Sequence, residues 1–107
     1  MTGRTIDQVE TLDDALQRLR ANAQDLRRSG VKALYLFGSA ARDELANDSD
    51  IDIFIDCDDS SVFTLLTLLQ LQNRLRDRLG REVDLMTRSS LHPDLRSDIE
   101  VSSIRVF

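Results

Sequence analysis

Apolar residues near the start of the chain recur at steps of three and four. They are Val9, Leu12, Leu16, Leu19, Ala23 and Leu26. This spacing places them along one stripe of a helix. Thr11 lies where an N-cap is needed, and Arg27 and Arg28 precede Gly30, an order typical of a helix C-terminus. The pattern predicts one helix over about residues 11–29.

Two stretches have the pattern of β-strands. Residues 31–37 are apolar apart from Lys32 and lie between Gly30 and Gly38, which suits a buried strand. Residues 50–56 alternate in character, so one face is apolar and the other mostly acidic. The first face has Ile51, Ile53 and Ile55, and the second has Asp50, Asp52, Phe54 and Asp56. We expect a strand here with one face in the core.

The remaining segments complete an alternation of helices and strands. We expect a helix over residues 39–45 with Ser39 as its N-cap, a long helix over 61–79 closed by Gly80, a strand over 82–87, a short helix from Pro93 through about residue 100, and a last strand over 104–107. This order predicts an α/β (α+β) fold, with a sheet covered by helices. The length of the chain predicts one domain over residues 1–107.

The long predicted helix has more apolar residues than one buried face needs. They crowd its first three turns as Val62, Phe63, Leu65, Leu66, Leu68, Leu69 and Leu71. Either this helix is sandwiched between the sheet and the first helix, or part of it contacts a partner protein. The sequence leaves both interpretations open.

The charge balance narrows the classes of function. The chain of 107 residues has 14 Lys and Arg against 19 Asp and Glu, a net charge of −5. A general nucleic-acid binder would need a basic face. The sequence has no charged-then-apolar leader and no apolar run near the ~18 residues of a membrane span. Because Cys57 is the one cysteine, no internal disulfide can form. We expect a cytoplasmic protein that binds neither nucleic acid nor membrane.

The junction after the first predicted strand favours phosphate binding. Gly38 and Ser39 would place backbone N–H groups and a hydroxyl at the start of a helix, where anions bind. Gly38 would also let a ligand approach the backbone closely. Arg42, one turn further along, could reach the same phosphate. A glycine and a serine before a helix are also common as a plain cap, so this signal needs support.

Three acids supply that support. Asp50 and Asp52 follow Ser39 after ten intervening residues, and two carboxylates two positions apart on a strand point to the same side. They repel each other unless a cation lies between them, and their hard oxygens suit Mg²⁺. Asp84, in a short apolar strand, adds a third carboxylate if the two strands pair. Such a set suits two metal ions in a phosphoryl displacement, with Asp84 as proton acceptor.

Simpler interpretations apply to each residue taken alone. An Asp-x-Asp pair by itself is usually a solvated strand edge. The Asp-x-Asp pair of haloacid dehalogenases is a poorer match, because there the nucleophilic Asp ends an apolar strand, whereas Asp50 and Asp52 begin one. We expect His92 to lie on the surface and Cys57 to fill the core. The remaining acids nearby are expected to cap helices or face solvent: Asp43, Glu44, Asp56, Asp58 and Asp59.

Together these residues resemble the minimal nucleotidyltransferase family of the polymerase-beta-like superfamily. The resemblance rests on Gly38-Ser39, ten residues, Asp50-x-Asp52 and the later Asp84, and it covers nearly the whole chain. It implies the polymerase-beta-like fold, a mixed β-sheet flanked by helices. One departure is Asp43, where the family usually has glycine after the arginine; it concerns the loop and not the metal site.

The resemblance also implies an activity. It implies transfer of AMP from ATP with two Mg²⁺ ions and release of pyrophosphate. Asp50, Asp52 and Asp84 would bind the metals, Asp84 would activate the acceptor hydroxyl, and Gly38 and Ser39 would hold the triphosphate. Members of this size are often antitoxins that modify a tyrosine of a HEPN-domain ribonuclease toxin.

Two other functions remain open at this point. The chain could be a binding module that neutralises its partner by complex formation alone, or the nucleotidyltransferase subunit of an enzyme for a small acceptor. Relatives that modify small molecules have an added helical domain, and the 107 residues leave no room for one. A protein acceptor is therefore expected, while the sequence does not distinguish a homo-oligomer from a hetero-oligomer.

Overall fold

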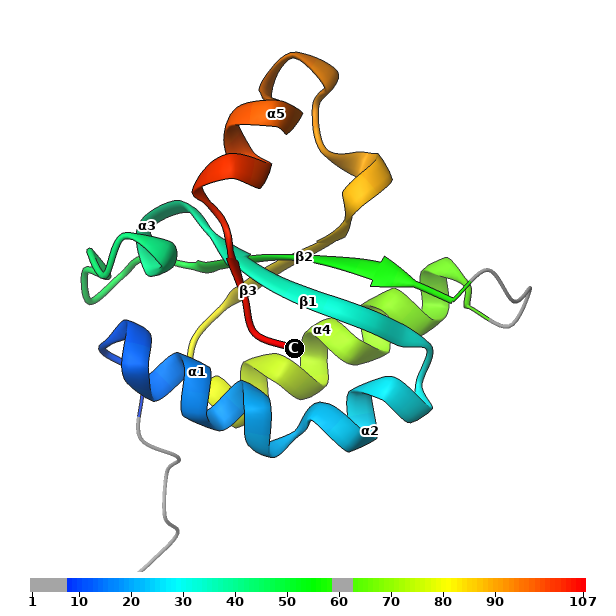
Figure 1. Ribbon diagram of the computed structural model, residues 1–107. Helices are drawn as coiled ribbons and strands as arrows, with labels where there is room; N and C mark the ends of the chain where they lie inside the picture. The colour runs from blue at the N-terminus through cyan, green and yellow to red at the C-terminus, as the bar shows by residue number, and fades with distance from the viewer. Residues whose placement is uncertain (1–7, 59–62) are drawn as a thin grey trace, which may run out of the picture.

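A computed structural model of the chain describes residues 8–58 and 63–107 (Figure 1). In chain order the elements are α1 (Leu12–Ala21), α2 (Ala23–Arg28), β1 (Val31–Phe37), α3 (Gly38–Ala41), β2 (Ile51–Cys57), α4 (Leu65–Leu79), β3 (Val83–Thr87), the 3-10 turn η1 (Arg88–Ser90), α5 (Pro93–Ser102) and β4 (Ile104–Arg105). The strands form one sheet in the order β3-β2-β1-β4. β1 is antiparallel to β2 and β4, and β2 is parallel to β3. The predicted fold of a mixed sheet flanked by helices is confirmed.

The hydrophobic core lies on one face of this sheet. Helices α1, α2 and α4 cover that face, whereas α5 stands on the other (Figure 1). The core joins alternate residues of the strands to one stripe from each covering helix. The buried members include Leu34, Leu36, Ile51, Ile53 and Ile55 from the strands and Leu19, Leu26, Leu71, Leu75 and Leu79 from the helices. Burial of each such side chain contributes roughly 1.5–3 kcal/mol.

Helix α4 divides its leucines between the core and the surface. Its second half gives Leu71, Leu75 and Leu79 to the core. In its first half, Leu65 and Leu66 are 71% and 63% exposed. The interpretation of a helix sandwiched on two sides is therefore wrong for the first two turns, which leave apolar side chains in contact with solvent.

The first predicted helix is two helices. α1 ends at Ala21 and α2 begins at Ala23, so the prediction of one continuous helix is wrong at Asn22. Asn22 has φ −103° and ψ 7°, outside the helical region, and its Nδ2 donates a hydrogen bond to the Arg18 carbonyl at 2.7 Å. Asparagine competes with the helical backbone in this way, which the apolar spacing does not reveal.

Two other predicted helices start or stop elsewhere. α3 is a single turn over Gly38–Ala41 that follows extended Phe37, so the helix predicted over 39–45 and the Ser39 N-cap are wrong. Asp43 has a left-handed φ of 56°, so the backbone leaves the helical path soon after Ala41. α4 begins at Leu65 because Thr64 forms a capping box with Thr67; residues 61 and 62 of that prediction lie outside the described residues.

Arg81 fixes the loop that leads into β2. Its side chain is 4% exposed and donates to three backbone carbonyls. The acceptors are Val9 at 2.5 Å, Ala46 at 2.6 Å and Ser49 at 2.9 Å. A buried cation is tolerated when its N–H groups are satisfied in this way. The loop therefore reaches Asp50 from a fixed position.

No helix in residues 8–58 and 63–107 combines the length and apolar character needed to cross a membrane.

Candidate active site

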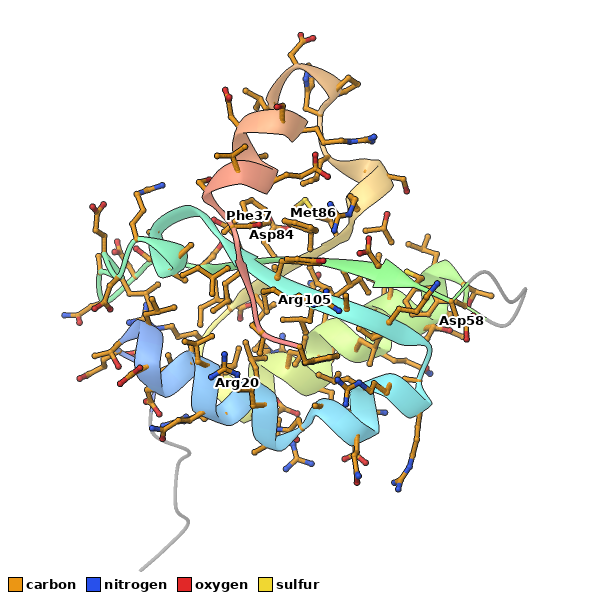
Figure 2. All side chains as sticks on the ribbon, viewed as in Figure 1. Arg20, Phe37, Asp58, Asp84, Met86 and Arg105 are labelled. Atoms are coloured by element: carbon orange, nitrogen blue, oxygen red, sulfur yellow. The ribbon has the colours of Figure 1, made fainter. Side chains whose placement is uncertain are left out.

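The parallel pairing of β2 and β3 places two of the predicted acids side by side. Asp52 is the register partner of Asp84, and on its other side Asp52 is paired with Phe37 of β1. Asp52 is half-buried, whereas Asp50 and Asp84 are exposed. Figure 2 shows Asp84 with Phe37 on the side of the sheet where α5 stands. The condition on which the sequence analysis made a third carboxylate depend, pairing of the strands that hold Asp52 and Asp84, is thus met.

Gly38 brings the backbone against the Asp52 carboxylate. It directly follows β1 and has φ 67°, a left-handed conformation that favours glycine. A Cβ built at Gly38 would lie 2.4 Å from Oδ2 of Asp52. Ser39 follows in α3, and its hydroxyl makes no hydrogen bond within the described part of the chain. The glycine–serine junction and the acidic strand therefore lie side by side, although they come from different elements.

The site concentrates negative charge around Asp52. Burial raises the pKa of the Asp52 carboxyl, the charges of Asp84 and Asp50 raise that pKa further, and Arg42 lowers it. Arg42 itself is exposed and pairs with Glu44 at 3.2 Å. Ionised Asp52 is thus disfavoured by its surroundings, which is the electrostatic condition that a bound cation relieves.

The donor chemistry of the acids suits Mg²⁺, but their side chains do not form a finished cage. Among the described residues, no three Asp, Glu, His or Cys side chains gather closely enough to hold a metal ion as they stand. Carboxylate oxygens are the ligands Mg²⁺ takes, and the ion usually keeps several ligands from water or phosphate. The residues therefore fit a metal whose coordination a nucleotide completes.

The other residues considered from the sequence lie apart from this site. His92 is exposed and caps α5 through a hydrogen bond from the Asp94 backbone to its Nδ1. Cys57 is half-buried. Burial raises the pKa of its thiol, and the negative charge of Asp56 raises that pKa further. The thiol is therefore a poor nucleophile. Asp59 lies outside the described residues.

Asp43 has a defined structural role instead of lying on an exposed helix face as predicted. Its Oδ1 accepts a hydrogen bond from the Leu12 backbone N–H at 2.8 Å. The residue adopts a left-handed conformation just after α3. Asp43 therefore supplies the turn for which glycine is usual and also ties this loop to the start of α1.

Arg88 is a prominent residue on the same sheet face that sequence reasoning did not identify. Its guanidinium donates to both carboxylate oxygens of Asp56, at 2.8 and 3.0 Å, and to Glu100. It also lies 4.8 Å from the centre of the Tyr35 ring and 5.0 Å from that of Phe54. These partners are dispersed along the chain, so no local pattern marks Arg88.

Comparison with known proteins identifies relatives along most of the chain. Residues 16–106 match the family described as nucleotidyltransferase domain. The chain is 39% identical over 100 residues to a candidate protein adenylyltransferase of Methanocaldococcus jannaschii, covering 92% of this chain and 100% of the relative. It is 39% identical over 82 residues to protein adenylyltransferase MntA of Thermococcus cleftensis, covering 76% of this chain and 81% of the relative.

Solved structures share the fold. A candidate minimal nucleotidyltransferase superposes with a TM-score of 0.77 at 31% identity, covering 88% of this chain and 94% of that one. A complex of a tri-AMPylated Shewanella oneidensis HEPN toxin with an MNT antitoxin matches with a TM-score of 0.62 at 22% identity, covering 86% of this chain and 71% of that one. The second likeness concerns the fold alone.

The substitution Gly38→Ala tests the close approach to Asp52. The new Cβ would displace the Asp52 carboxylate, and a left-handed alanine costs about 1–2 kcal/mol of unfolding free energy. We expect that loss in urea denaturation, together with loss of any activity that needs Asp52. Gly80→Ala is the matched control, because Gly80 has φ 69° and caps α4 away from the acids. Retained activity in Gly38→Ala would contradict the assignment.

The substitution Asp52→Asn tests the electrostatics of the site. Because the pKa of Asp52 is raised on folding, the folded protein binds a proton that the unfolded chain has released, and stability falls as the pH rises past the ordinary aspartate pKa of ~3.9. In EDTA at pH ~7 we expect the variant to melt at a higher temperature than wild type. The difference should shrink as the pH falls toward ~4.

Thermal scans at several pH values measure this difference. Asp77→Asn, which changes an exposed acid of α4, is the control. A variant whose melting temperature stays below that of wild type at every pH would show that Asp52 is not under repulsion.

Proposed function

The chain belongs to the nucleotidyltransferase domain family, and from this premise we propose that it is a single-domain, Mg²⁺-dependent protein adenylyltransferase. It would transfer AMP from ATP to a hydroxyl, that of a tyrosine, on a HEPN-type toxin and thereby act as the antitoxin of the pair. One observation carries this proposal: the register that sets Asp84 beside Asp52 while Gly38 passes against the Asp52 carboxylate.

Each acid has a role in the proposed reaction. Asp50, Asp52 and Asp84 would hold two Mg²⁺ ions, which when bound supply positive charge to the triphosphate and its transition state. The exposed Asp84 carboxylate would accept the proton of the acceptor hydroxyl. The hydroxyl oxygen forms a bond to the α-phosphorus, the bond from that phosphorus to the bridging oxygen breaks, and pyrophosphate leaves.

The residues after β1 would hold the triphosphate. Ser39 supports this role because its hydroxyl has no partner within the described residues. Arg42 supports the same role because its ion pair with Glu44 is exposed to solvent, and exposed ion pairs contribute little to stability. A phosphate could replace Glu44 as the partner of Arg42, since charge-assisted hydrogen bonds to phosphate are stronger.

The protein acceptor and the HEPN partner are supported by the relatives. The Thermococcus cleftensis relative is named a protein adenylyltransferase, and the Shewanella oneidensis complex pairs this fold with an AMP-modified HEPN toxin. A partner of this chain would need a docking surface. Leu65, Leu66 and Leu69, which are 71%, 63% and 49% exposed, offer apolar area for one.

The same leucines favour a second candidate function, neutralisation by binding alone. In that case the chain would cover its partner through the first half of α4, and the acids would be dispensable. The two functions differ in what they require of Asp52. Transfer needs its carboxylate, whereas neutralisation by docking alone does not.

Transfer of label from α-labelled ATP in a lysate of the source cell tests the proposal. With Mg²⁺ and the wild-type chain, we expect one labelled protein band. The band should disappear with EDTA and with Asp52→Asn, and weaken by about 10²–10⁴-fold with Asp84→Asn, the range for loss of a general base. Asp77→Asn is the matched control and should label the band like wild type.

Three results would contradict the proposal. A labelled band with Asp52→Asn would show that the reaction does not need the Asp52 carboxylate. Label in a small molecule without a protein band would indicate a small acceptor. A partner that stays bound and neutralised by Asp52→Asn, with no label in wild type, would favour the binding module.

A further inference from the structure

A basic cavity lies on the same sheet face as the acids, toward the opposite end of β2. Its volume is about 640 Å³, and four cationic side chains line it: Lys32, Arg88, Arg96 and Arg105. They come from β1, η1, α5 and β4, so the fold assembles them from four elements. We call this feature the basic cavity.

The basic cavity is separate from the candidate active site. Its wall on β2 is formed by residues from Ile55 to Asp58, and none of Gly38, Asp50, Asp52 or Asp84 lines it. Asp56 follows Asp52 by four residues on β2, which is roughly 13 Å along a strand. In Figure 2, Asp58 is labelled near the right-hand end of β2, whereas Asp84 is labelled beside Phe37 beneath α5.

Most of the cationic side chains of the basic cavity have no carboxylate partner among the described residues. Arg88 is neutralised, since it pairs with Asp56 at 2.8 Å and with Glu100. Within residues 8–58 and 63–107, Lys32, Arg96 and Arg105 form no ion pair. Asp58 is the other lining carboxylate. Three unpaired cations around one cavity stand out in a chain of net charge −5.

Arg96 is held in the wall of the basic cavity by a contact to the backbone. Its Nη2 donates a hydrogen bond to the Ser89 carbonyl at 3.1 Å, which orients the guanidinium. Its Nε is enclosed by protein atoms and has no hydrogen-bond partner in the described part of the chain. The Nη groups are therefore the part of Arg96 that a ligand in the cavity could contact.

The charge, geometry and size favour a phosphate ester. The planar guanidinium fork matches phosphate oxygens, and several cations around one group suit a phosphate better than a single carboxylate. A volume of about 640 Å³ is within the range of small-molecule sites and large enough for a mononucleotide.

We propose that the basic cavity binds the phosphate of a nucleoside monophosphate, on the same sheet face as the acids but apart from them. The phosphate could come from free AMP or from an AMP already joined to the acceptor as a phosphodiester. The first source does not depend on the proposed function, whereas the second rests on it.

NMR titration of the ¹⁵N-labelled full chain in EDTA tests the proposal without any transfer reaction. The two probes are AMP and O-adenylyl-tyrosine amide, a phosphodiester. We expect saturable shifts of the Arg96 Nε–H signal and of the amides of residues 32–35, 87–89 and 105. Tighter binding of AMP would identify the free nucleotide as the ligand, and tighter binding of the phosphodiester would identify the modified acceptor.

Matched variants then separate the cavity from general surface charge. Arg105→Gln and Lys32→Gln change exposed side chains that line the cavity and should each weaken binding at least ~5-fold. Arg78→Gln changes an exposed arginine of α4 and should bind like wild type. Equal weakening by all three, shifts confined to residues 38–42, or no saturable shift with either probe would overturn the proposal. Because no turnover is measured, an inactive chain could still pass this test.

Discussion

The candidate site depends on how closely the backbone at Gly38 passes the Asp52 carboxylate. Asp52 is central, because β1 ends beside it on one side and Asp84 lies beside it on the other. There is no space for a side chain at Gly38, since a Cβ would lie 2.4 Å from the carboxylate. The left-handed turn that starts α3 therefore places the glycine–serine junction against the acids. Without this contact, the glycine–serine junction and the acidic strand would be separate features of the surface.

The sheet face opposite the core is divided by charge. The acids gather at one end, where burial and mutual repulsion raise the pKa of Asp52. Cationic side chains gather at the other end, around the basic cavity. Between them Tyr35 and Phe54 stack at 4.6 Å, and Arg88 lies over both rings. This division agrees with the two proposals, in which the acidic end would hold a metal-bound triphosphate and the basic end a phosphate.

The sequence was sufficient for the positions of the strands and for the face that Asp52 occupies, which the alternation along residues 50–56 revealed. The pairing of β2 with β3 was only a condition of the predicted site, and the structure supplies it. Features set by distant contacts were not predictable. The break at Asn22 depends on one side-chain hydrogen bond, and the single turn of α3 depends on the contact of Asp43 with Leu12.

Other features of the molecule could not be predicted from sequence patterns either. The basic cavity combines residues from four elements, so no local spacing indicates it. The hold of Arg81 on the loop before Asp50 likewise joins segments far apart in the chain.

Titration with Mn²⁺, a paramagnetic substitute for Mg²⁺, tests the central claim that the acids and the glycine–serine junction form one metal site. In ¹⁵N spectra, the amide signals of Gly38, Asp52 and Asp84 should broaden first and together, and Asp84→Asn should weaken the effect. Broadening that begins at another acidic segment, such as residues 56–58, or that is unchanged in Asp84→Asn, would contradict it.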